Sequence, residues 1–293
     1  MIRCAPYVLV TAASNEAGFI ENTIRSVVAQ ELRPAKWVIV SDNSNDDTDA
    51  IVKKYAAVHG FIQLHRLSED HPRNFAAQAR AINAGIAQLQ STEFAFIGNL
   101  DADITLDSSY FRNLLEKFRH DPRLGLGGGM IYERSRDGNF RSRKLNSAAS
   151  VAHAVQLFRR ECLEAVGGAY LPLPYGAPDT YAEVTARMKG WRVASFPDLI
   201  AFHHRPTGSA GGLLRGCFWR GRMDYSIGIG PFFEVLKVLR RVWTKPYLIG
   251  SLARLAGFVG GYWRREQRAV SEQFMTYLRR EETEKIRGFL QSK

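Results

Sequence analysis

The first hundred residues alternate short apolar runs with amphipathic segments, and this alternation restricts the possible folds more than any other feature of the chain. Such a pattern predicts parallel strands that are joined and covered by helices. Strands are predicted at Tyr7 to Ala13, Trp37 to Ser41, Phe61 to Arg66 and Phe94 to Leu100, with helices at Glu16 to Ala29, Asp47 to His59 and Ala76 to Leu89. The expected fold class is therefore α/β, in the order βαβαβαβ.

Three polar clusters lie where predicted strands end. They are Thr11 to Asn15, Asp42 to Asn45 and Asp101-Ala102-Asp103. In open α/β sheets, ligands bind beyond the carboxyl ends of the strands, where the loops converge. We therefore expect the three clusters, which are far apart in the sequence, to line one crevice.

The Asp101-Ala102-Asp103 triplet is the strongest chemical signal in the chain. Two carboxylates one residue apart offer hard oxygen ligands to a divalent cation, and such a cation neutralises a departing diphosphate. Aspartates at this position could instead cap the helix expected near Ser108. The metal interpretation is favoured because the triplet directly follows the apolar strand FAFIGNL and shares its sheet with an Asp-rich loop.

Several segments together resemble the inverting family 2 glycosyltransferases, which have the GT-A fold. In chain order they are TAASNEAGFIENTIRSVVAQ, VIVSDNSNDDT, ARAINAG, NLDADITLD and LFRRECLEAVGGAYLPLPYGAPDTYAEVTARMKGWRV. The resemblance runs from about Tyr7 to about Gly208. It implies a GT-A domain over residues 1–208, with a nucleotide-sugar half up to about residue 104 and an acceptor half from 105. Residues 209–293 would form a C-terminal helical extension.

The resemblance also implies an activity. The chain would transfer a sugar from a nucleotide diphosphate sugar, with a UDP-sugar favoured, to a saccharide or lipid-linked acceptor in polysaccharide or glycolipid synthesis. Mn²⁺ or Mg²⁺ would be the cofactor, with Asp103 as its principal ligand and Asp101 beside it. By the same resemblance, the donor would be bound by Thr11, Ala12, Asn15, Glu16, Asp42, Arg80, Asp101 and Ala102.

An inverting transfer needs a general base that takes the proton from the acceptor hydroxyl. Asp179, in GAPDTYAEVTARMKGW, matches the catalytic aspartate of the family. Pro178 departs from the family pattern before that aspartate, so Glu183 stays open as a second candidate, and Asp179 could also be a helix N-cap. A histidine from the late segment HHRPTGS would complete the metal site, and His204 is preferred slightly over His203.

The C-terminal segment carries most of the net positive charge. The whole chain has a net charge of +11, and residues 205–293 hold 17 Lys and Arg against 7 Asp and Glu. Tyr247 to Trp263 is an apolar run with aromatic ends and cationic flanks, which suits a membrane boundary. A 17-residue helix rises only roughly 26 Å and carries Arg254 near its middle, which disfavours a membrane span. With Phe232 to Val242 it is expected to form an interfacial helix pair, so that residues 215–268 touch a membrane surface; an oligomer interface is the alternative.

Two other function classes compete with the glycosyltransferase. A sugar-phosphate nucleotidyltransferase would also use paired aspartates, but it would be expected to carry a cation in the loop after the first strand, which TAASNEAG lacks. A non-enzymatic basic protein that binds membrane or nucleic acid would leave the acidic cluster unexplained, and nucleic acid is not an expected partner. Three widely spaced cysteines and an N-terminus without signal-peptide features predict a cytoplasmic protein. The basic, apolar tail and the family resemblance together imply a peripheral position on the inner face of the plasma membrane.

Overall fold

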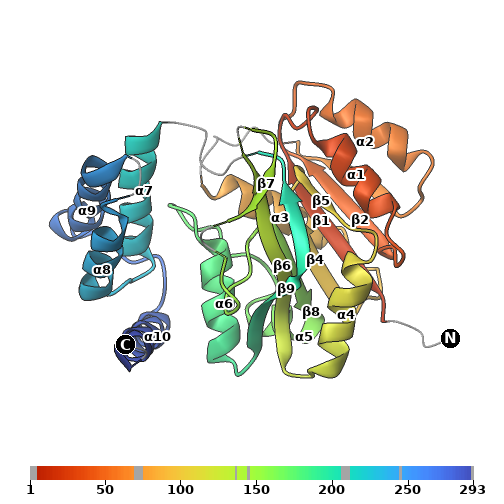
Figure 1. Ribbon diagram of the computed structural model, residues 1–293. Helices are drawn as coiled ribbons and strands as arrows, with labels where there is room; N and C mark the ends of the chain where they lie inside the picture. The colour runs from red at the N-terminus through yellow and green to blue at the C-terminus, as the bar shows by residue number, and fades with distance from the viewer. Residues whose placement is uncertain are drawn as a thin grey trace. The chain divides into compact units, whose positions relative to one another are not determined.

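The computed structural model describes residues 5–68, 75–135, 137–143, 146–205, 212–243 and 246–291. Its elements form two compact units. The sheet unit contains all the strands and helices α1 to α5, and the helical unit contains helices α6 to α10 (Figure 1). Residues 172–188 group with the C-terminal helices, whereas the sequence places them in the acceptor half of the first domain.

The first four strands of the sheet unit are parallel neighbours. They are β1 (Tyr7–Ala13), β2 (Lys36–Ser41), β3 (Ile62–Arg66) and β4 (Phe96–Leu100), and they stand in the order β3-β2-β1-β4. Helices α1 (Ile20–Val28), α2 (Thr48–Ala56) and α3 (Ala77–Ala87) connect them. The predicted βαβαβαβ order is confirmed. Helix α1 begins four residues later than predicted, because Asn15 takes a left-handed φ of 56° and the following residues form a turn.

Antiparallel strands extend this sheet beyond β4 and make it mixed. The described residues add β5 (Ile104–Leu106), β6 (Leu124–Arg134), β7 (Phe140–Ser142), β8 (Val155–Arg159) and β9 (Arg192–His203). The order continues β4-β8-β6-β9-β5, with β7 paired to β6. Strand β8 runs antiparallel to β4 and β6, and β5 runs antiparallel to β9. The mixed sheet flanked by helices confirms the predicted fold class.

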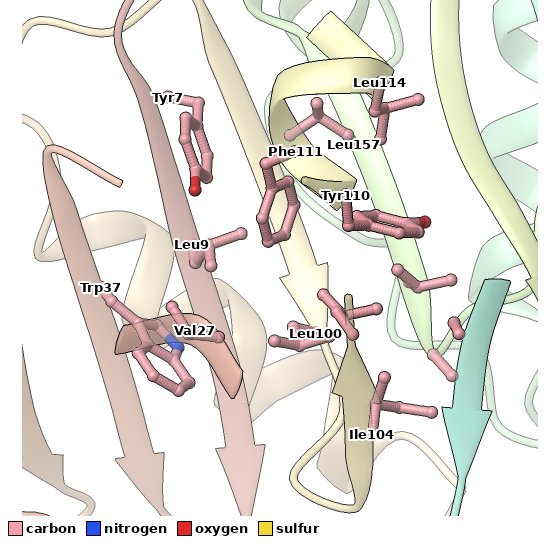
Figure 2. Packing of buried hydrophobic residues seen from close by; sticks show 14 of the residues in the cluster. Tyr7, Leu9, Val27, Trp37, Leu100, Ile104, Tyr110, Phe111, Leu114 and Leu157 are labelled. Carbon is pink, nitrogen blue, oxygen red and sulfur yellow. The ribbon is translucent and has the colours of Figure 1, made fainter. Parts of the chain in front are cut away.

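The central strands are buried on both faces, which explains their nearly continuous apolar sequences. On one face Leu9 and Trp37 join a core with side chains from α1 and from α4 (Tyr110–His120), as Figure 2 shows. On the other face Val10 packs against α3, where a Cβ on Gly85 would lie 2.4 Å from a Val10 methyl carbon. This double burial fixes the strand ends that carry the polar clusters.

The helical unit consists of α6 (Pro178–Met188), α7 (Leu213–Ser226), α8 (Pro231–Arg241), α9 (Tyr247–Trp263) and α10 (Glu272–Gln291). Helices α7 and α9 touch backbone to backbone, because a Cβ on Gly221 would lie 1.9 Å from the carbonyl oxygen of Arg254. Helix α6 is tied to α10 by the stacked rings of Tyr181 and Phe274, whose centroids are 5.0 Å apart. Among the described residues, no helix combines the length and the apolar character needed to cross a membrane.

Candidate active site

The aspartate triplet lies in the turn between β4 and β5, within the sheet unit. The Asp101 N–H donates to the carbonyl oxygen of Ala154 at 2.9 Å, and the carbonyl oxygen of Ala102 accepts from the Thr23 hydroxyl at 2.7 Å. Ala102 itself is buried. These bonds hold the turn rigidly from both sides, so the positions of the two carboxylates are set by the sheet and by α1.

Asp103 is a buried carboxylate between two basic groups. Its Oδ1 atom lies 3.3 Å from Nε2 of His203, and its Oδ2 atom accepts from Nε of Arg205 at 3.0 Å. Burial opposes ionisation of this side chain, but the hydrogen bonds and charges of His203 and Arg205 outweigh it and lower the pKa of Asp103. Burial likewise disfavours the charged form of His203, yet Asp103 raises its pKa overall. Asp103 is therefore held as an anion.

Arg205 connects the triplet to the loop after β1. Its guanidinium bonds both Asp103 and the carboxylate of Glu16, and it lies 5.2 Å from the ring centroid of Phe19. Burial raises the pKa of Glu16, and its contact with Arg205 offsets part of that effect. The hydrogen bond to Glu16 is the largest cause that raises the pKa of Arg205. One arginine thus compensates two carboxylates from distant parts of the chain.

Asp101 has a different set of neighbours. Its Oδ1 atom accepts from Nε2 of Gln78 at 3.0 Å and from Nδ2 of Asn99 at 3.5 Å, and it lies 3.8 Å from Nδ1 of His153. Asn99 also donates to the carbonyl oxygen of His153 at 2.6 Å. The Asp101 side chain is about a quarter exposed, at 23%, against 8% for that of Asp103. Asp101 therefore offers the more accessible carboxylate of the pair.

The remaining sequence-predicted donor residues lie around the ends of β1 and β2. Thr11 is fully buried, and its hydroxyl donates to the Leu100 carbonyl oxygen at 2.6 Å while accepting from the Trp37 indole at 2.9 Å. Its side chain therefore joins the strands together. Asn15 accepts from the Asn45 N–H at 2.9 Å, and the Asp42 N–H donates to the Ala13 carbonyl oxygen at 2.8 Å. Ala12, Asn15 and Asp42 are half-buried at these strand ends, and Arg80 is half-buried in α3.

The two adjacent histidines face opposite ways. Neighbouring residues of a strand point to opposite faces, and His203 is the last residue of β9. His203 meets Asp103, whereas Nε2 of His204 lies 2.8 Å from the hydroxyl oxygen of Thr105 and its ring packs on Phe140. Burial and the charge of Arg134 lower the pKa of His204. The geometry therefore favours His203 as the histidine of the site, in place of the sequence preference for His204; Pro206 to Gly211, which include the end of HHRPTGS, lie outside the described residues.

The two candidate bases belong to the helical unit, where Asp179 lies in the first turn of α6 and Glu183 in its middle. Asp179 is half-buried, and its Oδ1 atom accepts from the Thr180 N–H at 2.8 Å. Glu183 is buried and lies 3.6 Å from Nη1 of Arg187, which makes two bonds of 2.5 and 3.0 Å to Glu281 in α10. Glu183 is thus part of an ion-pair chain that holds α6 to α10, and Asp179 is the more accessible carboxylate.

Sequence comparison decides the family. The profile of glycosyl transferase family 2 matches residues 8–168, which is more than half of the chain. The chain belongs to glycosyl transferase family 2. This family 2 glycosyltransferase is 25% identical over 251 residues to the poly-beta-1,6-N-acetyl-D-glucosamine synthase of Staphylococcus aureus. The match covers 78% of this chain and 57% of the relative, so the chain spans little more than half of that relative's length.

Solved structures confirm the fold of the glycosyltransferase. The mannosyltransferase PcManGT from Pyrobaculum calidifontis superposes with a TM-score of 0.59 at 16% identity, over 94% of this chain and 79% of that one. TarS from S. aureus, as residues 1–349, superposes with a TM-score of 0.55 at 15% identity, over 93% and 78% of the two chains. The family assignment favours a glycosyltransferase over the nucleotidyltransferase and the non-enzymatic protein that the sequence analysis also considered.

The described part of the glycosyltransferase has no group of three His, Cys, Asp or Glu side chains arranged to hold a metal ion. The residues that come nearest to forming such a group are Asp103 and His203, together with Asp101. Mg²⁺ is commonly bound by one or two carboxylates together with the phosphates of a substrate, and not by a complete protein cage. The carboxylates and histidine present here fit a cation of that kind, whose remaining ligands would come from a diphosphate.

Four neighbours of the aspartates were not found from the sequence. Arg205 lies inside the quoted HHRPTGS segment, so its position after the two histidines was the available signal. Asn99 opens the quoted segment NLDADITLD, so its place two residues before Asp101 was the available signal. Gln78 and His153 stand in no quoted segment, and only the fold brings them to Asp101.

Proposed function

We propose that this protein is an inverting glycosyltransferase that moves a sugar from a nucleotide diphosphate sugar to a saccharide or lipid-linked acceptor, with the help of a divalent cation. The observation that carries the proposal is the buried, ionised Asp103 at the carboxyl end of β4, with His203 and Arg205 against its two oxygens. A carboxylate kept anionic in a buried position is suited to a strongly cationic partner.

The donor class is supported by the solved structures that share the fold. PcManGT was solved with GDP-Man and Mn²⁺, and TarS with UDP-GlcNAc. The sequence relative is named as a synthase of a poly-N-acetylglucosamine. We infer a UDP-sugar as the donor, with UDP-N-acetylglucosamine as the first compound to examine, and polysaccharide or glycolipid synthesis on the cytoplasmic side of the membrane as the setting.

The nucleotide would lie along the ends of β1 and β2. Ala12, Asn15 and Asp42 are half-buried there, and the buried hydroxyl of Thr11 holds β1 against the end of β4. Residues 1–104 would thus form the donor half and residues 105–208 the acceptor half. Arg80, which is half-buried in α3, would face the phosphates.

Asp103, Asp101 and His203 would hold the cation, and the cation would supply positive charge to the departing diphosphate. In the structure, Arg205 bonds both Asp103 and Glu16. A guanidinium binds phosphate oxygens well because its N–H groups form a planar fork. We infer that Arg205 turns from Asp103 towards the diphosphate when the donor binds, so that the site keeps its charge balance.

Asp179 would be the general base that takes the proton from the acceptor hydroxyl. It is half-buried at the start of α6, whereas Glu183 is buried in the ion-pair chain with Arg187. A carboxylate that supports packing is poorly placed to exchange protons with an acceptor. The proposal therefore assigns the base to Asp179 and a structural role to Glu183.

A thermal-unfolding screen tests the proposal without knowledge of the acceptor. UDP, GDP, dTDP and UDP-N-acetylglucosamine are each added with and without Mn²⁺. Stabilisation by at least one nucleotide that depends on Mn²⁺ is expected, because a ligand that binds only the folded state raises its stability by mass action. If no nucleotide changes the unfolding temperature under either condition, the donor proposal fails.

A further inference from the structure

The helical unit has an unusual distribution of charged and apolar side chains between α7, α8 and α9, which lie side by side (Figure 1). A charged cluster fills its interior, made of Asp224 from α7, Glu234 and Lys237 from α8, and Arg254 from α9. Arg254 donates to Glu234 at 2.7 Å and also bonds Asp224, while Lys237 lies 2.9 Å from Asp224. Arg254 is only 5% exposed and Glu234 is fully buried. The three helices therefore hold together partly through buried ion pairs.

The outer surface of the same helices is apolar. Of the sixteen large hydrophobic side chains that are exposed in the described residues, fourteen lie between 213 and 263. We define the apolar face as the exposed side chains of α8, α9 and their junction: Phe232, Val235, Leu236, Leu239, Trp243, Tyr247, Leu248, Ile249, Leu252, Val259, Tyr262 and Trp263. Trp243 and Trp263 are the most exposed of them, at 85% and 88%. Exposed apolar surface gathered in this way marks a site that binds another protein or a membrane.

The positions along each helix show that the arrangement is regular. In α8, Phe232, Val235, Leu236 and Leu239 follow the spacing of one helical face, and Glu234 and Val238 are buried on another. In α9, Leu248, Leu252 and Val259 share one stripe, whereas Ser251, Arg254 and Phe258 are buried. Each helix thus turns one ionised residue, Glu234 or Arg254, inwards and a stripe of apolar residues outwards.

Between residues 212 and 265, the charge that the described residues expose is positive. Asp224 and Glu234 are the only acidic residues between 212 and 265 in the sequence, and both are buried in the charged cluster. The cations Arg215 and Arg220 of α7, Arg240 of α8, and Arg264 and Arg265 after α9 are exposed. A second copy of the chain would bring the same positive charges together across a symmetric interface, which is unfavourable. An anionic surface is the complementary partner.

We propose that the apolar face of α8 and α9 docks on a bilayer that contains anionic phospholipid. Trp243 and Trp263 enter the headgroup region, and the flanking arginines contact lipid phosphates. Tryptophan prefers the membrane interface because its ring is amphipathic, and basic residues add attraction to anionic lipid. The charged cluster stays inside the helical unit, so docking needs no burial of unpaired charge. This proposal concerns a lipid surface and does not depend on the sugar donor.

Sedimentation with vesicles tests the proposal on the full chain. Vesicles of phosphatidylcholine with phosphatidylglycerol should bind the protein, vesicles of phosphatidylcholine alone should bind it at least about tenfold more weakly, and high salt should weaken the first interaction. The triple variant Arg240→Gln, Arg264→Gln and Arg265→Gln should lose about tenfold or more in binding to anionic vesicles. The control Lys53→Gln, Lys54→Gln and Arg123→Gln removes three exposed cations of the sheet unit and should bind as the wild type does.

A second pair of variants tests the apolar face. Trp243→Ser with Trp263→Ser should abolish the binding that persists in high salt and remove the blue shift of tryptophan fluorescence on vesicle addition, and Val58→Ser should do neither. Equal binding to both vesicle types, or full binding by the tryptophan variant, overturns the proposal. So does a wild type that ignores vesicles and forms a dimer that the tryptophan variant cannot form. Nucleotide binding is measured separately, so these failures leave the proposed function standing.

Discussion

The Nε atom of Arg205 lies 3.0 Å from Oδ2 of Asp103, at the carboxylate that we propose as the principal metal ligand. The same guanidinium bonds Glu16, so it connects two carboxylates from distant parts of the chain. A protein cation in this position would compete with a divalent ion for one oxygen of Asp103. Under our proposal, binding of the divalent ion and movement of Arg205 would therefore be coupled.

Replacement of Arg205 should show whether its side chain competes with a divalent ion for Asp103. Arg205→Gln leaves Asp103 and Glu16 without their shared partner and should destabilise the fold by about 1–3 kcal/mol, discounted because Arg205 is partly exposed. Mn²⁺ without nucleotide should then raise the unfolding temperature more in the variant than in the wild type. Arg112→Gln, which breaks an exposed ion pair with Glu31, serves as the control and should show no such difference. An equal response to Mn²⁺ in all three proteins would show that Arg205 does not compete with the ion.

Kinetic measurements should distinguish the roles of the two carboxylates of α6. Asp179→Asn should lower the transfer rate by roughly two to four orders of magnitude with nucleotide affinity nearly unchanged, which is the range for loss of a general base. Glu183→Gln should mainly lower the unfolding temperature, because it removes one of the two acidic partners of Arg187. Rates and nucleotide affinities of both variants give the comparison. If the rate falls with Glu183→Gln and not with Asp179→Asn, the roles must be exchanged.

The close contact of α7 and α9 predicts a contrast between two glycines of α7. Gly221→Ala would place a Cβ 1.9 Å from the Arg254 carbonyl oxygen and should destabilise the protein by about 1–3 kcal/mol. Gly216→Ala meets no atom within 4 Å and should be neutral or stabilising by up to about 1 kcal/mol, because alanine favours the helix. Chemical denaturation measures both. Equal stabilities would mean that the two helices do not approach so closely.

A pH dependence follows from Glu282 of α10. Burial raises the pKa of Glu282 to about 7, while its Oε2 atom accepts from the Gly230 N–H at 3.0 Å. Between pH 4.5 and 7 the folded state keeps a proton that the unfolded state has lost, so this stability is full at low pH and disappears as pH rises through 7. Glu282→Gln should therefore remove about 3 kcal/mol of the difference in stability between pH 5 and pH 8. Glu284→Gln, an exposed position of the same helix, should keep that difference.

The sequence was sufficient to predict the first strands of the sheet, but it was not sufficient to predict the contacts within the candidate site. The alternation of apolar runs was sufficient for the first four strands, because burial on both faces of a parallel sheet demands continuous apolar residues. The choice between His203 and His204 was not available from the sequence, since adjacent strand residues face opposite ways and only the pairing of β9 with β5 shows which one meets Asp103. The contact of Arg205 with Glu16 spans 189 positions and has no local pattern.

In the C-terminal helices too, the bounds of an element could be predicted from the sequence, but its contacts with other helices could not. The limits of α9 were predicted because the run from Tyr247 to Trp263 is apolar except for Ser251 and Arg254. Arg254 in its middle was taken from the sequence as an argument against a membrane span, but its partners could not be known. They lie on two other helices, at Asp224 and Glu234, and the four-group cluster exists only once all three helices are packed.

Calorimetric titration of UDP tests most directly whether Asp103 carries the donor site. With the wild type, Mn²⁺ should increase UDP affinity at least about tenfold, which corresponds to about 1.4 kcal/mol. Asp103→Asn should bind UDP with the same weak affinity in the presence and absence of Mn²⁺. Asp107→Asn, an exposed aspartate four residues along the same segment, should retain the full effect. If Asp103→Asn keeps the Mn²⁺-dependent gain in UDP affinity, Asp103 is not the metal ligand and the proposed site is wrong.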